Sequence, residues 1–404
     1  MKCWISEIRL HIAAAAVAVF LATYWLPLTI DFGLIALTLG ATAALHFSPE
    51  SRFRLWPWPN AWIIAFAASL VLSILLSGHP QRSLLLSLPF IPATLLYLLL
   101  SRYVKKGRGI TIVQAGLSAG AALIAVIVLL GSVYQRTDPT GLIKSLALPI
   151  LVVPNDLLVL AICIPLILGC ALATKQAFLK LFAAASIILS LAAMVMVNSR
   201  SALLASAFGI FIVAVFQRVR WMWISLIGAA AGLLALDGAR GFPLLLKFAQ
   251  APQCDPRRPL WAAAVRLWTE HPLLGYGMHN YRELYRDRIE SFTLPACAMG
   301  DERLTPWPHN LFLELLSSQG VMGTLPFAVL IVWGVNRSYR AACHVNDPDR
   351  LFAVGLLGSF GAFIFASLIE LTFLRYWVII MVATLIGLAA ALKQPSTPIA
   401  GAYS

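Results

Sequence analysis

Long apolar runs separated by short polar segments make up most of the chain. Twelve such runs can be counted, each near the roughly 20 residues that a helix needs to cross a bilayer. They cover residues 10–29, 32–47, 61–77, 83–101, 110–132, 155–174, 178–197, 201–217, 221–237, 319–336, 352–371 and 375–392. The pattern predicts an all-α polytopic membrane protein of about 12 transmembrane helices. Helices 1–9 occupy residues 1–237, helices 10–12 occupy 309–393, and a tail follows at 394–404.

The only long hydrophilic connection runs from residue 238 to residue 308. Its first half contains a helical pattern. Pro256 or Pro259 suits the first turn of this helix, and Pro272 ends it. A second, charge-rich helical pattern follows at about 278–292. An apolar stripe at helical spacing marks the first pattern and is interpreted as packing rather than as a stack for substrate; it consists of Trp261, Ala264, Val265 and Trp268.

Composition agrees with the hydropathy pattern. Hydrophobic residues make up 60% of the chain and charged residues only 12%, whereas soluble domains carry about 25% charged residues. The net charge of +13 would favour nucleic acid as a partner of a soluble protein. In a membrane protein the same excess holds short loops on the cytoplasmic side, so nucleic acid is excluded as the expected partner.

The distribution of the 30 Lys and Arg residues sets the orientation. With the N-terminus inside, the short outer segments hold only Arg82, Arg136, Lys144, Arg200 and Arg375, and the inner segments hold 16. The remainder lie in the long connection, which does not count in this rule. Both termini are therefore expected in the cytoplasm and residues 238–308 outside it.

Two of the six cysteines, Cys254 and Cys297, share this outer connection. An oxidising compartment permits a disulfide between them, which we predict, with two free thiols as the alternative because sequence alone does not fix their proximity. No C-x-x-C or metal-ligand spacing occurs in the chain. The D-x-D spacing of Asp347 and Asp349 lies in a short basic inner loop, and turn formation at Asn346–Pro348 explains it without a metal.

Polar residues that this topology places on the outer face are the candidates for chemistry. Arg200, Arg257 and Arg258 are candidates for binding an anion, because guanidinium groups and helix N-termini both donate to phosphate oxygens. His309 and Asn310 stand where the connection re-enters the membrane. Three further outer-face candidates stand at span ends, namely Asn155, Asp156 and Glu370.

Each candidate also has a purely structural interpretation. Arg200 could anchor its helix at the interface, and Arg257 and Arg258 could be solvated loop charges. His309 could be a helix N-terminal residue that moves no proton. Glu370 could form only an ion pair with Arg375. The functional interpretation rests on the convergence of these residues beside one amphipathic connection.

Several motifs together resemble the bacterial O-antigen ligase family. They are Ser199-Arg200-Ser201 at the start of a span, Arg257 four residues before Trp261, the run His271-Pro272-Leu273-Leu274-Gly275-Tyr276-Gly277, and His309-Asn310-Leu311-Phe312-Leu313-Glu314. The segment 257–314 is the most specific part, and Val153-Pro154-Asn155 at a span start also looks like that family. The adjacency of Arg257 and Arg258 leaves open which of them matches the arginine of the family motif.

The resemblance implies a GT-C-type glycosyltransferase of the bacterial inner membrane, with its active site on the periplasmic face. It would transfer O-antigen polysaccharide from undecaprenyl diphosphate to lipid A–core oligosaccharide, with no metal, cofactor or nucleotide sugar. His309 would be the general base, with Asn310 or Glu314 orienting it and Glu370 as the next candidate base. One displacement would invert the anomeric centre.

Two alternatives remain at this stage. O-antigen polymerases share the ligase domain, so the same motifs fit a polymerase. A twelve-span transporter belongs to a different class and would show two related halves with broken helices near the midplane. Neither feature is visible in the sequence.

Overall fold

The computed structural model describes residues 17–19, 21–23, 59–103, 107–137, 154–217, 254–286, 293–297, 307–343 and 349–392, with a few residues between 223 and 241. The run at 32–47 and the tail at 394–404 lie outside these residues, as do most of the runs at 10–29 and 221–237, and the second loop pattern beyond Arg286.

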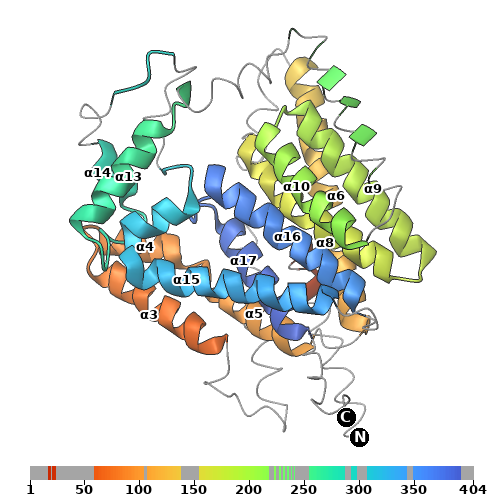
Figure 1. Cartoon of the computed structure of the whole chain (residues 1–404), viewed down its shortest axis with the longest axis horizontal. Helices are drawn as coiled ribbons and strands as arrows, with labels where there is room; N and C mark the ends of the chain where they lie inside the picture. Colours follow the sequence, from red (N-terminus) through yellow and green to blue (C-terminus); the bar gives the residue numbers. More distant parts are fainter. Residues whose placement is uncertain are drawn as a thin grey trace, which may run out of the picture.

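The described residues are helical, with no strand among them, which confirms the all-α prediction (Figure 1). The helices of the apolar runs are α3 (Asn60–Leu75), α4 (Pro80–Ser87), α5 (Phe90–Tyr103), α6 (Gly107–Thr137), α8 (Leu158–Ala173), α9 (Ala177–Met196), α10 (Arg200–Gln217), α15 (Leu311–Cys343), α16 (Arg350–Ile369) and α17 (Tyr376–Ala391). A short 3-10 helix, η1 (Pro154–Leu157), precedes α8, and the connection contributes α13 (Arg258–Glu270) and α14 (Tyr281–Arg286).

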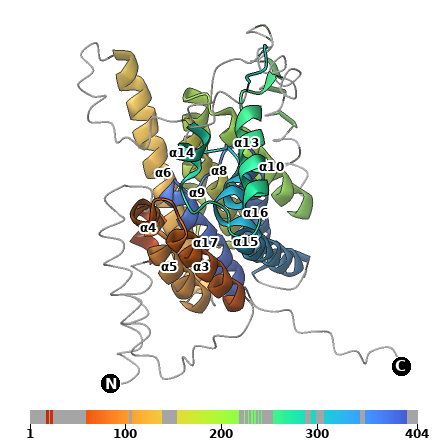
Figure 2. The ribbon, with the colours of Figure 1, turned by 90° about the vertical axis from the view of Figure 1, so that its left-hand side faces the viewer.

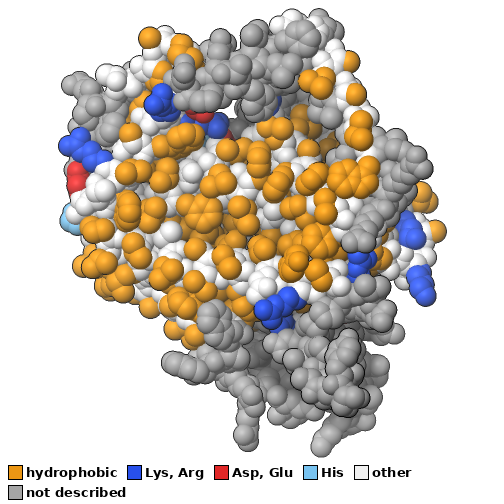
Figure 3. All heavy atoms as spheres, in the orientation of Figure 1, with side chains coloured by type: hydrophobic (Ala, Val, Ile, Leu, Met, Phe, Trp, Pro, Cys, Tyr) orange, Lys and Arg blue, Asp and Glu red, His pale blue; other side chains and the backbone are white. Residues whose placement is uncertain are grey.

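Six segments of the described chain are long and apolar enough to cross a membrane, so the protein is a multi-pass membrane protein. They are Pro80–Ser101, Gly109–Gly131, Ala177–Met196, Arg200–Gln217, Leu311–Cys343 and Arg350–Ile369. Three shorter apolar helices, α3, α8 and α17, accompany them. Figure 3 shows a broad hydrophobic area across one face of the molecule, with charged side chains above and below it.

Two predicted runs differ from the helices observed. The run at 83–101 is two helices, because α4 ends before Leu88 and α5 begins after Pro89, whose ring lacks the N–H that a continuous helix needs. The run at 319–336 belongs to a longer helix, α15, which begins at Leu311 and is kinked at Gly320 (φ 60°). The turns before the kink therefore belong to the same helix as the span.

Small residues allow the central helices α8, α10 and α16 to pack closely. A Cβ on Gly169 of α8 would lie 2.5 Å from the Cα of Gly355 of α16, and one on Gly209 of α10 would lie 2.9 Å from the oxygen of Gly358. Such backbone approach is the usual source of helix association in lipid, where burial of apolar surface contributes little. Figure 1 shows α8, α10 and α16 side by side.

Arginines predicted to lie in the cytoplasm gather at one end of this bundle. Arg337 donates to the oxygens of Ala389 (3.1 Å) and Leu392 at the end of α17. Arg350 donates to Ala342 O of α15 (3.1 Å) and Phe216 O of α10 (2.7 Å). Because these carbonyls lie at helix C-termini, where the helix dipole is negative, cations stabilise them. The outer-face candidates lie at the other ends of α10, α15, α16 and α17.

The kink in α15 is closed by the backbone of the His271–Gly277 run. Ser317 O and Ser318 O accept from the N–H groups of Tyr276 and Gly277, both at 2.9 Å. In return Val321 N donates to Pro272 O (2.9 Å) and Met322 N to Leu273 O (3.1 Å). The kink leaves backbone groups that lipid cannot satisfy, and this segment satisfies four of them. The motif is therefore a structural joint between the connection and α15.

Replacing Gly275 by alanine should disrupt this joint. Gly275 has φ 64°, and a Cβ there would lie 2.4 Å from the backbone carbon of Ser318. The conformation alone costs a non-glycine residue about 1–2 kcal/mol, and overpacking adds about 1–3 kcal/mol. Thermal unfolding in detergent should show a clearly lower midpoint, whereas Gly78→Ala, with nothing within 4 Å, should match the parent. An unchanged midpoint for Gly275→Ala would show that the joint does not hold α15.

The start of α14 docks on α3 and α4 through buried polar contacts. Ser83 Oγ donates to Met278 O at 2.6 Å, and Asn280 Nδ2 donates to Ser77 Oγ at 2.6 Å. Burial, with Arg82 nearby, lowers the pKa of His279 to about 4, so this imidazole is neutral at pH 7. These contacts attach the connection to the transmembrane helices. Figure 2 shows α13 and α14 above α3 and α4.

The buried face of α13 differs from the predicted stripe. Leu260, Ala263, Ala264 and Leu267 are buried, whereas Val265 is 42% exposed and Trp261 and Trp268 are half-buried. Two apolar stripes overlap on this helix, and the one with the smaller side chains packs against Tyr281 and Tyr285. The prediction of a packed face was correct, but the face was assigned one position away. Pro259 lies in the first turn, as expected.

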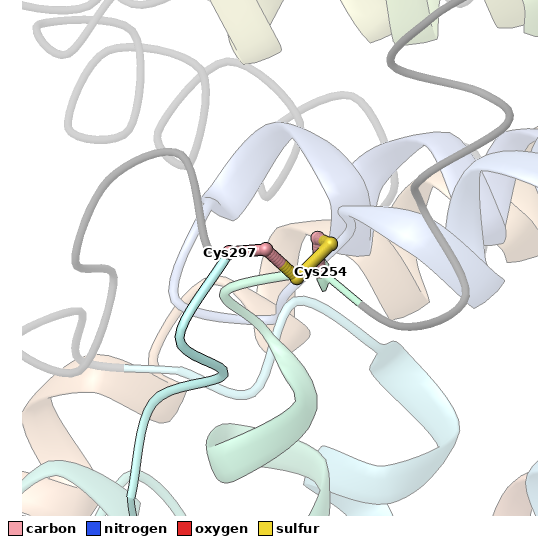
Figure 4. Close-up of a disulfide and its surroundings, with 2 residues drawn as sticks. All are labelled: Cys254 and Cys297. Atoms are coloured by element: carbon pink, nitrogen blue, oxygen red, sulfur yellow. A yellow bond between two sulfur atoms is a disulfide. The ribbon is translucent and has the colours of Figure 1, made fainter.

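Cys254 and Cys297 are joined by a disulfide across the connection, with a Cα–Cα distance of 5.1 Å (Figure 4). The loop closed by residues 43 apart would contribute about 3–4 kcal/mol in the chain-entropy model. Mass spectrometry of non-reduced peptides should recover the linked pair. In the same sample Cys343, an exposed free cysteine, should be alkylated. Alkylation of Cys254 and Cys297 without reductant would refute the bond.

Candidate active site

The turn between α16 and α17 lies at the centre of the candidate site. Residues from two distant segments, at the starts of α13 and α15, bind its backbone or side chains. Asn310 Nδ2 donates to Leu368 O at 3.0 Å, and Arg257 Nη1 donates to Ile369 O at 2.8 Å. The amide of Phe373 donates to Glu314 Oε2 at 3.3 Å. The turn is therefore fixed in place before any substrate binds.

Glu370 in this turn joins two of the candidate residues. Its Oε1 lies 2.8 Å from His309 Nδ1, and its Oε2 accepts from Arg257 Nη2 at 2.7 Å. Its side chain is completely buried, whereas that of Arg257 is 23% exposed. A buried carboxylate is costly unless it is paired and hydrogen-bonded, and Glu370 is both. The structural interpretation in which Glu370 only forms an ion pair with Arg375 is wrong, because Glu370 pairs with Arg257.

His309 is held in an unusual backbone conformation. Its φ is 52°, in the left-handed region that costs a non-glycine residue about 1–2 kcal/mol. The conformation turns the chain so that Asn310 caps α15, where Asn310 Oδ1 accepts from the N–H groups of Phe312 (3.0 Å) and Leu313 (3.1 Å). Strain of this kind is concentrated at functional sites. The imidazole itself is buried.

The pairing with Glu370 determines what His309 can do chemically. A carboxylate that accepts from Nδ1–H leaves the lone pair of the neutral ring on Nε2. The ring can then take a proton at Nε2, and Glu370 stabilises the imidazolium that forms. The prediction that Asn310 or Glu314 orients His309 is wrong, because Glu370 makes that contact. Asn310 and Glu314 instead hold the turn that carries Glu370.

The structure separates the two adjacent arginines. Arg257 caps the start of α13 and reaches Glu370, and its own amide donates to Asp255 Oδ1 at 2.9 Å. Arg258 begins the helix and is exposed. One residue step on a helix turns a side chain by about 100°, which is why the two point to different surroundings.

Arg200 lies at the start of α10, two residues after Asn198, which also has a positive φ of 58°. In the described part of the chain the Arg200 side chain makes no hydrogen bond or ion pair, and it is half-buried. Asn155 lies in η1, which adjoins α10.

Asp156, one of the outer-face candidates, forms an ion pair with Arg375 at 2.7 Å. The sequence offered no signal for this pair, because its members are separated by most of the chain. Within the described residues no cluster of three or more His, Cys, Asp or Glu side chains could hold a metal ion. Of the D-x-D motif only Asp349 is described, and it precedes α16 as its N-cap.

Comparison with known proteins confirms the family resemblance. Residues 185–328 match the family model described as O-antigen ligase, and no curated protein sequence matches the chain. The matched segment contains Arg200, Arg257 and His309, whereas Glu370, which joins the last two, follows it. Residues 185–328 are therefore similar to the O-antigen ligase family.

Proposed function

We propose that this protein transfers a glycan from undecaprenyl diphosphate to a sugar hydroxyl of lipid A–core oligosaccharide. The observation that carries the proposal is the contact chain from Arg257 through Glu370 to His309. This chain joins Arg257, a cation that can bind a diphosphate, to His309, a base that can take the proton of a hydroxyl. The family implies a lipid-linked glycan as substrate, and the apolar helices give both lipids access from the membrane.

The proton transfer falls to His309. The acceptor hydroxyl gives its proton to Nε2 while its oxygen attacks the anomeric carbon, which inverts that centre. Proton abstraction by a positioned side chain contributes about 10²–10⁴-fold to rate. Glu370 holds the ring through Nδ1 and stabilises its charged form. This is metal-independent chemistry of the GT-C type.

Arginines stabilise the negative charge that develops on the diphosphate leaving group. As the bond from the anomeric carbon to the diphosphate oxygen breaks, that oxygen becomes negative, and fixed cations stabilise it. Arg257 and Arg200 fill this role, and Arg258, which is exposed at the start of α13, is the third candidate. Arg257 has a second role, since it also holds Glu370.

An apolar pocket near this turn suits part of a lipid chain. It is lined by α3, α5, α15 and α17 and by the ring of Phe373, which follows Glu370 by three residues. Four aromatic rings of its lining contact one another, namely those of Phe66, Phe90, Phe327 and Phe373. A chain bound there would have its diphosphate near the Glu370 turn.

Reconstituted transfer tests the proposal. Purified protein in proteoliposomes would receive an undecaprenyl-diphosphate glycan and lipid A–core, and the product would be a glycan-bearing lipid A–core that His309→Ala does not form. A glycan that passes only to a second undecaprenyl-diphosphate glycan would identify a polymerase instead. Absence of both products from the parent would reject glycan transfer.

The orientation is part of this proposal. We infer twelve spans in the bacterial inner membrane, both termini in the cytoplasm and the 238–308 connection in the periplasm, from the Lys and Arg bias. Alkaline phosphatase fused after Gln250 should be active, since the enzyme folds only outside the cytoplasm, and a fusion after Asn346 should be inactive. The reverse pattern would invert the orientation and move the site to the cytoplasmic face.

A further inference from the structure

A second set of contacts approaches His309 through Trp307 rather than through Glu370. Asp156 and Arg375 form an ion pair at 2.7 Å, with only 11% and 12% of their side chains exposed. The indole N–H of Trp377 also donates to Asp156 Oδ1, at 3.3 Å. None of these residues takes part in the proton transfer or the binding of the diphosphate proposed above.

The ion pair reaches His309 through an aromatic ring. The guanidinium carbon of Arg375 lies 5.2 Å from the centre of the Trp307 ring, within the range of a cation–π interaction. The Trp307 ring centre lies 5.3 Å from that of His309, with 44° between the planes. Trp307 therefore lies between a fixed cation and the imidazole.

The hydrogen bond to Glu370 leaves one motion of the imidazole undetermined. A tilt of the ring about that bond would move Nε2, the atom that receives the proton. The left-handed backbone of His309 adds strain that neighbouring contacts must offset. The packing of Trp307 against the ring opposes such a tilt.

We propose that Asp156, Arg375 and Trp307 are positioning residues that fix the tilt of the His309 ring. Asp156 directs Arg375, Arg375 holds Trp307 by its face, and Trp307 packs against the imidazole. The inference rests on the proposed role of His309 as general base. A misplacement of about 1 Å in a catalytic group can cost on the order of 10²-fold in rate, so loss of this support affects turnover more than binding.

The test compares two substitutions of Trp307 with a matched control. Trp307→Ala removes the ring and should lower kcat by at least about 10-fold, with the donor KM within about twofold of the parent, since the misplaced group acts in the chemical step. Trp307→Phe keeps an aromatic face and should recover most of that loss. Trp333 lies under Arg337 at 6.0 Å at the opposite end of the bundle, and Trp333→Ala should leave kcat unchanged. Asp156→Asn should lower kcat in the same direction as Trp307→Ala.

A double variant separates positioning from a general structural role. If Trp307 acts through His309, Trp307→Ala should have little further effect on the residual rate of His309→Ala, because coupled residues are not additive. An equal loss in both backgrounds would overturn the inference, as would equal losses in Trp307→Phe and Trp307→Ala. A change confined to the donor KM would also overturn it, since it would make Trp307 a substrate contact. If the parent itself transfers no glycan, the proposed function fails and this inference with it.

Discussion

Replacing His309 by alanine is expected to lower the rate of glycan transfer by about 10²–10⁴-fold, the usual contribution of a positioned general base. Donor affinity should change little, because the arginines hold the diphosphate and His309 contacts Glu370 rather than the lipid. The measurement is kcat in the reconstituted assay, with donor binding determined in parallel. Glu370→Gln should also lower kcat, since an amide lacks the charge that stabilises the imidazolium.

His271 is the matched control for this prediction. It ends α13 beside Tyr276, with the two ring centres 4.3 Å apart, and lies in the connection but outside the Glu370 cluster. His271→Ala should therefore keep most of the parental kcat. A His309→Ala variant that turns over at the parental rate would exclude His309 as the base. A defect that a high donor concentration rescues would assign His309 to donor binding instead.

Arg257 and Arg258 should differ sharply although they are adjacent and chemically identical. Arg257→Ala is expected to cost at least about 10²–10³-fold in kcat/KM for the donor, the usual effect of removing one donor to a developing charge. It also breaks the pair with Glu370 and leaves that buried carboxylate with fewer partners. Arg258→Ala should stay within about tenfold of the parent, because Arg258 is exposed.

A lysine at position 257 tests the geometry of the contact. Arg257 uses two guanidinium nitrogens, one on Ile369 O and one on Glu370, and a lysine offers a single charged group without the planar fork. Arg257→Lys should therefore rescue transfer only in part. Equal losses in Arg257→Ala and Arg258→Ala would show that positive charge at the start of α13 matters rather than the contact with Glu370. Arg200→Ala should fall in the range of Arg257→Ala if Arg200 binds diphosphate, and near the parent if it only anchors α10.

The tertiary structure also revised the roles of residues that sequence had identified. Asn310 and Glu314 were expected to orient His309, and Trp261 and Trp268 to form the packed face of α13. The first pair instead holds the Glu370 turn, and the packed face is formed by Leu260, Ala263, Ala264 and Leu267. Both errors come from the same limit. Spacing shows which residues share a helix face, but not which neighbouring element that face meets.

The sequence by itself determined the helical membrane architecture, the resemblance to the O-antigen ligase family, and Arg257 and His309 as candidates, because apolar length and short motifs are local properties. Only the tertiary structure decided which charges pair. His309 and Glu370 are 61 residues apart and Arg257 and Glu370 are 113 apart, and Asp156 lies in the turn before α8 while Arg375 precedes α17. Such pairs depend on how α8, α13, α15, α16 and α17 pack, which no single segment encodes. Arg257 and Arg258 are equivalent in a motif, and packing alone places one beside a buried carboxylate and exposes the other.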